Sequence, residues 1–158
     1  MFAGVTLAGE DNDAAFRVFV AQAEPRLRRA LVAAYGYERG REATAEALAY
    51  AWQNWNRLSE VDNLTGYLYR VGQSRTRRSK TPVLFDRPSL EEPLFEPRLI
   101  SALAALPQRQ RVAVFLAHGA GWTHAEVAEL MGVKAPTVQK HIERGLAHLR
   151  RLLVSKEI

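Results

Sequence analysis

The sequence predicts an all-α protein made of two small helical domains that are joined by a flexible linker, with a helix-turn-helix in the C-terminal domain. Three observations predict this fold. Apolar residues recur at helical spacing, whereas few segments alternate with the period of two that is typical of a half-buried strand. Four of the seven prolines fall between residues 80 and 97, where no regular apolar periodicity is present. A short capped helix, a glycine turn and a longer helix then follow one another near the C-terminus.

The charge distribution supports the same division. The formal net charge of +5 separates into +2 for residues 1–79, −2 for residues 80–97 and +5 for residues 98–158. Prolines and acidic residues in the middle segment are typical of a linker. We therefore expect a helical domain over 1–79, a proline-rich acidic linker over 80–97 and a basic helix-turn-helix domain over 98–158.

Three helices are expected in the first domain, at about residues 12–34, 42–55 and 62–80. The first can be capped by Asn12 or Asp13, and Pro25 should kink it because proline lacks the backbone N–H that a helix interior needs. Gly36 and Gly40 then punctuate the chain before the alanine-rich second helix.

The C-terminal domain carries clearer signals. Pro107 suits the first position of a helix that reaches about residue 118. Thr123 and Glu126 have the spacing of a capping box, in which each side chain bonds the backbone N–H of the other residue. This short helix ends at Gly132, and Pro136 opens a longer helix to about residue 153.

The longer helix has two distinct faces. At about 100° per residue, one side forms a buried apolar stripe of Val138, Ile142, Leu146, Leu149 and Leu153. The other side carries Thr137, Lys140, His141, Arg144, His148 and Arg151. Charges alone favour a solvated surface helix, but together with the capping box and the glycine turn they favour a recognition helix that enters the major groove. There Arg144 or Lys140 could read guanine and Gln139 adenine, with Arg150 or Arg151 at phosphates.

A family resemblance is carried by one set of motifs within residues 102–152: Leu106-Pro107, Arg111, Glu126-Val127-Ala128, Gly132-Val133, Thr137-Val138, Arg144 and Leu149-Arg150. This segment closely resembles region 4 of the extracytoplasmic-function (ECF) sigma factors of the sigma-70 family. The resemblance implies that one set of residues faces the minus-35 promoter element: Thr137, Gln139, Lys140, His141, Glu143 and Arg144.

The first domain decides between a sigma factor and a simple regulator. Residues 66–71, Gly-Tyr-Leu-Tyr-Arg-Val, resemble a helix of family region 2. A basic face beside aromatic rings is what binding of an unpaired DNA strand requires. The resemblance implies minus-10 and single-strand contacts by Trp52, Trp55, Asn56, Arg57, Arg70, Ser74, Arg77 and Arg78. For the two tryptophans, core packing is the competing interpretation.

The family's acidic polymerase-binding patch is represented here by residues 43–49, in which only Glu46 is charged. The resemblance therefore implies a weaker contact with polymerase, or one routed through Glu42, Glu46, Gln53 and Asn54. The expected partners are core RNA polymerase and promoter DNA, with an anti-sigma factor as a further candidate. Two alternatives stay open: a LuxR-like helix-turn-helix regulator that binds duplex DNA without polymerase, and a sigma-like interaction module without promoter activity.

Enzymatic and membrane functions have little support in the sequence. The chain has no cysteine, which excludes disulfide scaffolds, zinc fingers and cysteine nucleophiles. No two of the four histidines are three or four residues apart, and phosphate-binding glycine loops and nucleophile motifs are missing. The longest uninterrupted apolar stretch, 112–117, is far shorter than the ~20 residues that span a bilayer. We expect a cytoplasmic, nucleoid-associated protein that is not an enzyme and needs no cofactor, metal or small-molecule substrate.

Overall fold

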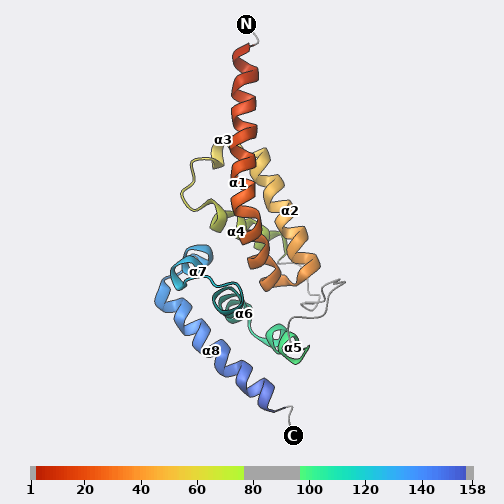
Figure 1. Cartoon of the computed structure of the whole chain (residues 1–158), viewed down its shortest axis with the longest axis vertical. Coiled ribbons are helices and arrows are strands. Elements are labelled where there is room, and N and C mark those ends of the chain that lie inside the picture. The colour runs from red at the N-terminus through yellow and green to blue at the C-terminus, as the bar shows by residue number, and fades with distance from the viewer. Residues whose placement is uncertain (1–2, 77–96, 156–158) are drawn as a thin grey trace.

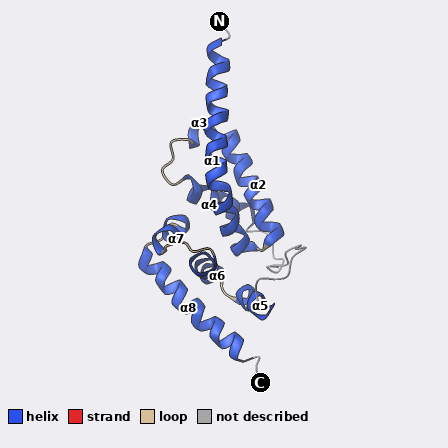
Figure 2. Cartoon of the chain, viewed as in Figure 1, coloured by secondary structure: helices blue, strands red, loops and turns tan. Residues whose placement is uncertain are grey.

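The computed structural model describes residues 3–76 and 97–155. Within these residues all regular secondary structure is helical, so the predicted all-α class is confirmed (Figure 2). The helices of the N-terminal module are α1 (Ala3–Tyr35), α2 (Tyr37–Gln53), α3 (Trp55–Leu58) and α4 (Leu64–Thr76). Those of the C-terminal module are α5 (Pro97–Ala105), α6 (Gln108–Val114), the π-helical turn η1 (Phe115–Gly119), α7 (His124–Met131) and α8 (Ala135–Val154).

Helix α1 is longer than its sequence pattern predicts. It begins at Ala3 rather than near residue 12, and it continues through Pro25. Its N-terminal part extends beyond the rest of the molecule (Figure 1). Burial on α1 begins at Ala23 and is complete at Leu27 and Leu31, so the C-terminal half anchors the helix in the core. Apolar periodicity predicted this anchored half and not the projecting one.

The two glycines expected to interrupt the chain have different roles. Gly36 has φ of 87°, a conformation that costs glycine little, and it separates α1 from α2. Gly40, in contrast, lies inside α2, so its assignment as punctuation was wrong. A Cβ atom on Gly40 would lie 2.5 Å from Val32 Cα, which shows that α1 and α2 pack with their backbones in close approach. The absence of a side chain at Gly40 permits this approach.

The helix-turn-helix forms as predicted. Thr123 Oγ1 accepts a hydrogen bond of 3.1 Å from the Glu126 backbone N–H, and the Thr123 backbone N–H donates to Glu126 Oε1 at 3.2 Å. Gly132 ends α7 in the left-handed conformation, with φ of 69°. Pro136 lies in the first turn of α8. The predicted helix from Pro107 is shorter than expected, because Pro107 serves as the N-cap and η1 replaces regular α-helix after Val114.

Helix α5 was not predicted from the sequence. It lies against the C-terminal half of α8 and contributes Ala102 to a small apolar cluster, in which Leu106, the residue after α5, packs with Val114 and Leu149. Its short apolar pattern lies next to the proline-rich segment, which hid the signal. Pro97, expected to end the linker, is the first residue of α5, and the rest of the expected 80–97 linker lies outside the described residues.

One apolar core continues from the N-terminal module into the C-terminal module. It includes Leu27 and Leu31 of α1 together with Val112 of α6, Leu116 of η1 and Val127 of α7. Helix α6 contacts α1 on one side and α8 on the other, as Figure 1 shows. The modules therefore contact each other directly in the folded chain.

Candidate nucleic-acid interface

The outer face of α8 presents polar side chains to solvent, while its inner face is buried. Val138, Ile142 and Leu149 are at most 6% exposed. Exposed side chains on the outer face belong to Gln139, Lys140, Glu143 and Arg144. The predicted division of this helix into a core stripe and a polar face is thus confirmed in part. Three residues expected on the polar face are half-buried instead: Thr137, His141 and His148.

Two of these polar residues are already paired. Gln139 Nε2 donates to Glu143 Oε1 at 3.1 Å, which orients the Gln139 amide along the helix. Lys140 and Arg144, in contrast, have neither a hydrogen-bond nor an ion-pair partner among the described residues. Unpaired cations on the N-terminal half of a recognition helix are free to donate to guanine O6 and N7 or to phosphate.

His141 does not fully belong to the exposed face on which it was placed. Its side chain is half-buried, and its Nε2 atom is buried without a hydrogen-bond partner among the described residues. Burial lowers the pKa of His141, and the positive charges of Arg109 and Arg144 lower it further. His141 therefore contributes an uncharged ring at the edge of the face. Thr137 is also half-buried.

The pKa of His141 predicts a pH dependence of stability. Above its ordinary pKa of about 6.5, His141 is neutral in both the folded and the unfolded chain. Its contribution to the free energy of unfolding is then fully present. As the pH falls below that value, the unfolded chain binds the proton more readily, and the free energy of unfolding decreases. Urea unfolding between about pH 7 and pH 5 should show this loss of stability. His141→Gln should make the free energy of unfolding depend less on pH over the same range. If the free energy of unfolding changed equally with pH in both proteins, the role of His141 would be contradicted. Glu126, whose pKa is also lowered, affects stability only in a more acidic range.

The two tryptophans of the N-terminal module have different environments. Trp55 is 8% exposed and packs edge-on against Phe16 at 5.3 Å between ring centroids. Its role as a DNA contact is therefore corrected to core packing, because no face is open to a base. Trp52 is 47% exposed, with its ring centroid 5.0 Å from that of Phe16. An exposed indole supported from behind is suited to stacking.

A polar aromatic cluster lies beside Arg57. The Arg57 guanidinium donates to Tyr50 Oη at 2.8 Å, and the hydroxyl oxygens of Tyr50 and Tyr67 are 3.4 Å apart. Hydrogen bonds from Tyr67 and Arg57 lower the pKa of the Tyr50 hydroxyl, and the charge of Arg75 acts in the same direction. The predicted site residues omitted Tyr50, Tyr67 and Arg75. The aromatic and basic residue types of this segment were the signal, but their grouping depends on how α2 packs against α4.

The other described residues that were predicted to contact the single strand lie on α3 and α4. Asn56 is exposed, and its Oδ1 accepts from Asn12 Nδ2 at 3.0 Å. Arg70 and Ser74 are exposed on α4, with Ser74 Oγ donating to the Val71 carbonyl at 2.9 Å. Arg77 and Arg78 lie outside the described residues.

The residues predicted to contact polymerase lie on α2 and just after it. Glu42, Glu46 and Gln53 are exposed on this helix. Asn54 is half-buried, and its Nδ2 donates to the Tyr50 carbonyl at 2.9 Å. Part of its side-chain amide is therefore already hydrogen-bonded within the N-terminal module. Among these predicted residues, only Glu42 and Glu46 supply carboxylates.

The described residues contain no group of three or more histidine, cysteine, aspartate or glutamate side chains that could hold a metal ion. In residues 3–76 and 97–155, no helix has the length and apolar character needed to cross a membrane.

Comparison with known proteins gives a match where the helix-turn-helix lies. Residues 97–149 match the family model described as Sigma-70, region 4. This segment of the chain is therefore similar to region 4 of the sigma-70 family. The fold is similar to that of the sigma factor RpoE from Bartonella quintana, solved in complex with the anti-sigma factor NepR. That comparison has a TM-score of 0.63 at 18% sequence identity and covers 87% of this chain and 96% of the other.

The family-model match covers 53 of the 158 residues, and at 18% identity the solved structure shows a likeness of fold. Region 4 begins at Pro97 and includes α5, the helix that the sequence analysis missed. The matched region ends at Leu149, so it contains all of the polar residues expected to face the minus-35 element.

Proposed function

We propose that this chain is a sigma factor of the ECF type that binds core RNA polymerase through the exposed side of α2, reads minus-35 duplex with α8 and holds the minus-10 strand with the surface formed by the C-terminal end of α2 together with α3 and α4. The observation that carries the proposal is the polar face of α8, where Lys140 and Arg144 are exposed and unpaired within the described part of region 4. Side chains there reach base edges, and they require no covalent chemistry.

An anti-sigma factor is part of the proposal, because RpoE, the structural neighbour, was solved with one. A protein of this kind would hold the sigma factor away from polymerase. A location at the nucleoid follows from promoter binding. Catalysis is not required of any residue, because opening the duplex draws on binding energy from stacked bases and phosphate contacts.

The proposal is tested by reconstituted transcription. Purified sigma factor, core polymerase and a library of promoter fragments should give transcripts from a specific subset of sequences, with initiation that weakens as salt rises. A protein that shifts duplex DNA but never associates with core polymerase would instead be a stand-alone regulator. A protein that binds neither duplex DNA nor core polymerase would be an interaction module.

A single substitution tests the role assigned to Trp52. Trp52→Ala should weaken binding of holoenzyme to a single-stranded minus-10 oligonucleotide by about tenfold, because base–aromatic stacking contributes roughly 1–3 kcal/mol per base. Fluorescence anisotropy with a labelled oligonucleotide at fixed salt measures the affinity.

Trp52→Phe is the matched control, since it keeps a flat ring that packs against Phe16 and should retain most of the affinity. Unchanged binding by Trp52→Ala in a holoenzyme that still forms would remove this residue from the single-strand site.

A further inference from the structure

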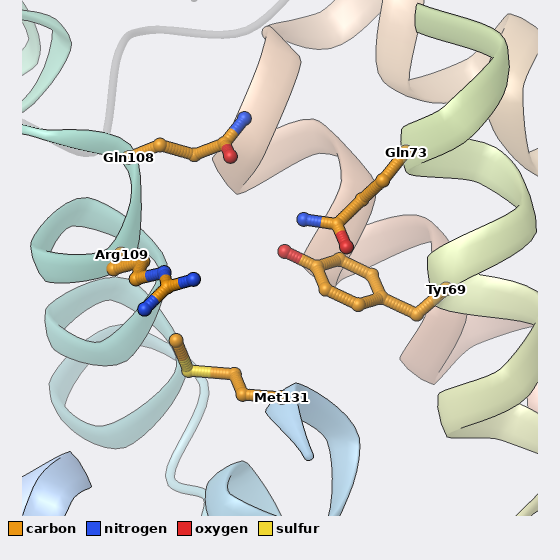
Figure 3. Close-up of a pocket in the computed structure, with 5 residues that line it drawn as sticks. All are labelled: Tyr69, Gln73, Gln108, Arg109 and Met131. Atoms are coloured by element: carbon orange, nitrogen blue, oxygen red, sulfur yellow. The ribbon is translucent and has the colours of Figure 1, made fainter. Parts of the chain in front are cut away.

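A small polar cavity lies where α4 faces α6 and α7. It has a volume of about 70 Å³ and is lined by Tyr69 and Gln73 of α4, Gln108 and Arg109 of α6, and Met131 of α7. Figure 3 shows the tyrosine hydroxyl and the guanidinium pointing into this space from opposite sides. A space of this size has room for about two water molecules, or for one small ion in their place.

Tyr69 forms the buried floor of the cavity. It is 3% exposed, and its hydroxyl has no hydrogen-bond partner among the described residues. Burial raises the pKa of this hydroxyl, so it stays protonated and is able to donate; the charges of Arg111 and Arg109 act in the opposite direction on that pKa. Because buried polar groups are almost always hydrogen-bonded, the Tyr69 hydroxyl requires a partner inside the cavity.

Arg109 supplies the positive charge at the rim of the cavity. Its side chain is exposed, and in residues 3–76 and 97–155 it has neither an ion-pair nor a hydrogen-bond partner. Arg111 differs, because its buried guanidinium donates from Nε to the Ala33 carbonyl at 2.7 Å and from Nη1 to the Leu106 carbonyl at 2.8 Å. Arg111 is therefore committed to the protein, whereas Arg109 is available to a ligand.

The two glutamine side chains add further donors. Gln73 has no side-chain hydrogen bond among the described residues, and Gln108 Nε2 makes only a long contact of 3.4 Å to the Ala34 carbonyl. None of the described residues that line the cavity is acidic. Water would satisfy the hydroxyl and the amides, but it would leave the charge of Arg109 without a counter-charge. An anion would satisfy all of these groups, and charge-assisted hydrogen bonds are the stronger ones.

We propose that this cavity is an oxyanion site that takes a phosphate group, with Arg109 as its ion-pairing residue and Tyr69 as the buried donor that orients it. The planar fork of an arginine matches two oxygens of a phosphate, and the tyrosine hydroxyl can donate to a third. Met131 lines the remaining wall of the site.

Phosphate groups occur both free in solution and in the DNA backbone, and the site fits the chemistry that they share. The charge of Arg109 also acts on His141 of α8, so the rim of the cavity lies near the proposed recognition helix. A backbone phosphate would make the site an additional duplex contact, and only this source rests on the proposed function. The site itself depends only on the side chains described above.

A titration of the full chain with inorganic phosphate tests the site. Phosphorus NMR at constant ionic strength measures binding directly, which is preferable to thermal shifts because phosphate salts stabilise folded proteins in general. The unaltered protein should show one saturable site. Arg109→Gln should weaken the affinity by about tenfold or more, and Tyr69→Phe by about fivefold, because each loses hydrogen bonds to a charged ligand.

Two matched variants control for nonspecific binding to a basic protein. Arg29→Gln replaces another exposed arginine, on α1, and Tyr35→Phe replaces a half-buried tyrosine; neither residue lines the cavity. Both variants should retain the affinity of the unaltered chain. Tyr69→Phe removes no hydrogen bond between described residues, so without phosphate its thermal midpoint should match that of the unaltered chain, which separates a binding defect from misfolding.

Duplex binding in a chloride buffer distinguishes the two sources of phosphate. If the DNA backbone fills the site, inorganic phosphate alone should not saturate it. Arg109→Gln and Tyr69→Phe should then weaken binding to all duplex sequences by the same factor. Arg109→Gln should also reduce the slope of log affinity against log salt by about 1.

The proposal is overturned if phosphate binds with the same affinity to Arg109→Gln, Tyr69→Phe and the unaltered chain. It is also overturned if free phosphate does not bind and both variants keep the unaltered duplex affinity, since the cavity would then hold water only. Saturable phosphate binding, lost in the two variants, by a chain that never supports transcription would establish the site and contradict the proposed function.

Discussion

Gly40→Ala is expected to destabilise the folded chain by about 2 kcal/mol, because overpacking of a close contact typically costs about 1–3 kcal/mol. The added Cβ atom would lie 2.5 Å from Val32 Cα and 2.6 Å from Val32 N, and both of these are backbone atoms. A side chain could rotate away, but backbone cannot, so α1 and α2 would have to separate. This loss exceeds the gain in helix propensity of about 1 kcal/mol on replacing glycine by alanine.

Gly9→Ala is the matched control for this prediction. Gly9 also lies in a helix, but its added Cβ atom would meet no other atom within 4 Å. Only the propensity gain remains there, so this variant should be as stable as the original chain or slightly more stable. Thermal unfolding followed by circular dichroism should place the midpoint of Gly40→Ala roughly 4–8 °C lower. A midpoint equal to that of Gly9→Ala would contradict the packing argument.

Arg144→Ala is expected to weaken binding to the preferred minus-35 duplex by about ten- to one-hundredfold, because a bidentate contact to guanine contributes about 1–3 kcal/mol of discrimination. Arg144 is exposed on α8 and has no side-chain partner among the described residues, so its removal breaks no internal hydrogen bond there. Stability should therefore remain within about 0.5 kcal/mol of the original, as is usual for surface substitutions.

Arg151→Ala separates base reading from phosphate binding. Arg151 is also exposed on α8, but it lies near the C-terminal end of the helix, where phosphate contact is expected. Arg151→Ala should weaken binding to preferred and unrelated duplexes equally. Arg144→Ala should instead reduce the ratio of the affinity for the preferred duplex to the affinity for unrelated duplexes. Electrophoretic mobility shifts at one salt concentration measure this affinity ratio for each variant. Equal losses for the two variants on every sequence would mean that Arg144 reads no base.

Local signals explain why the helix-turn-helix could be predicted. The Thr123 and Glu126 capping box, the left-handed Gly132 and the early Pro136 act within a few residues of themselves, so their spacing in the chain determines their geometry. The apolar stripe of α8 is likewise a property of one helix. These features led from the sequence to a DNA-binding domain, and the match to sigma-70 region 4 supports that conclusion.

Other assignments needed partners that are distant in the chain. The residue types of Trp52 and Trp55 allow either stacking or core packing, and helix packing decides between them. Phe16 contacts both rings, whereas Phe19 contacts the ring of Trp55, which is the buried one. His141 was placed on the exposed face by its helical angle alone. Arg109, whose charge acts on the imidazole, belongs to α6, and this helix packs against α8.

The sequence by itself determined that the chain is helical, where α7 and α8 begin and end, and that its C-terminal part resembles sigma-70 region 4. Tertiary structure alone decided that Gly40 is a packing contact and that Arg111 binds carbonyls of a helix about 77 residues away in the chain. The physical reason is range: caps, turns and amphipathic stripes are set by neighbours in sequence, whereas burial and the partners of a guanidinium depend on which helices meet.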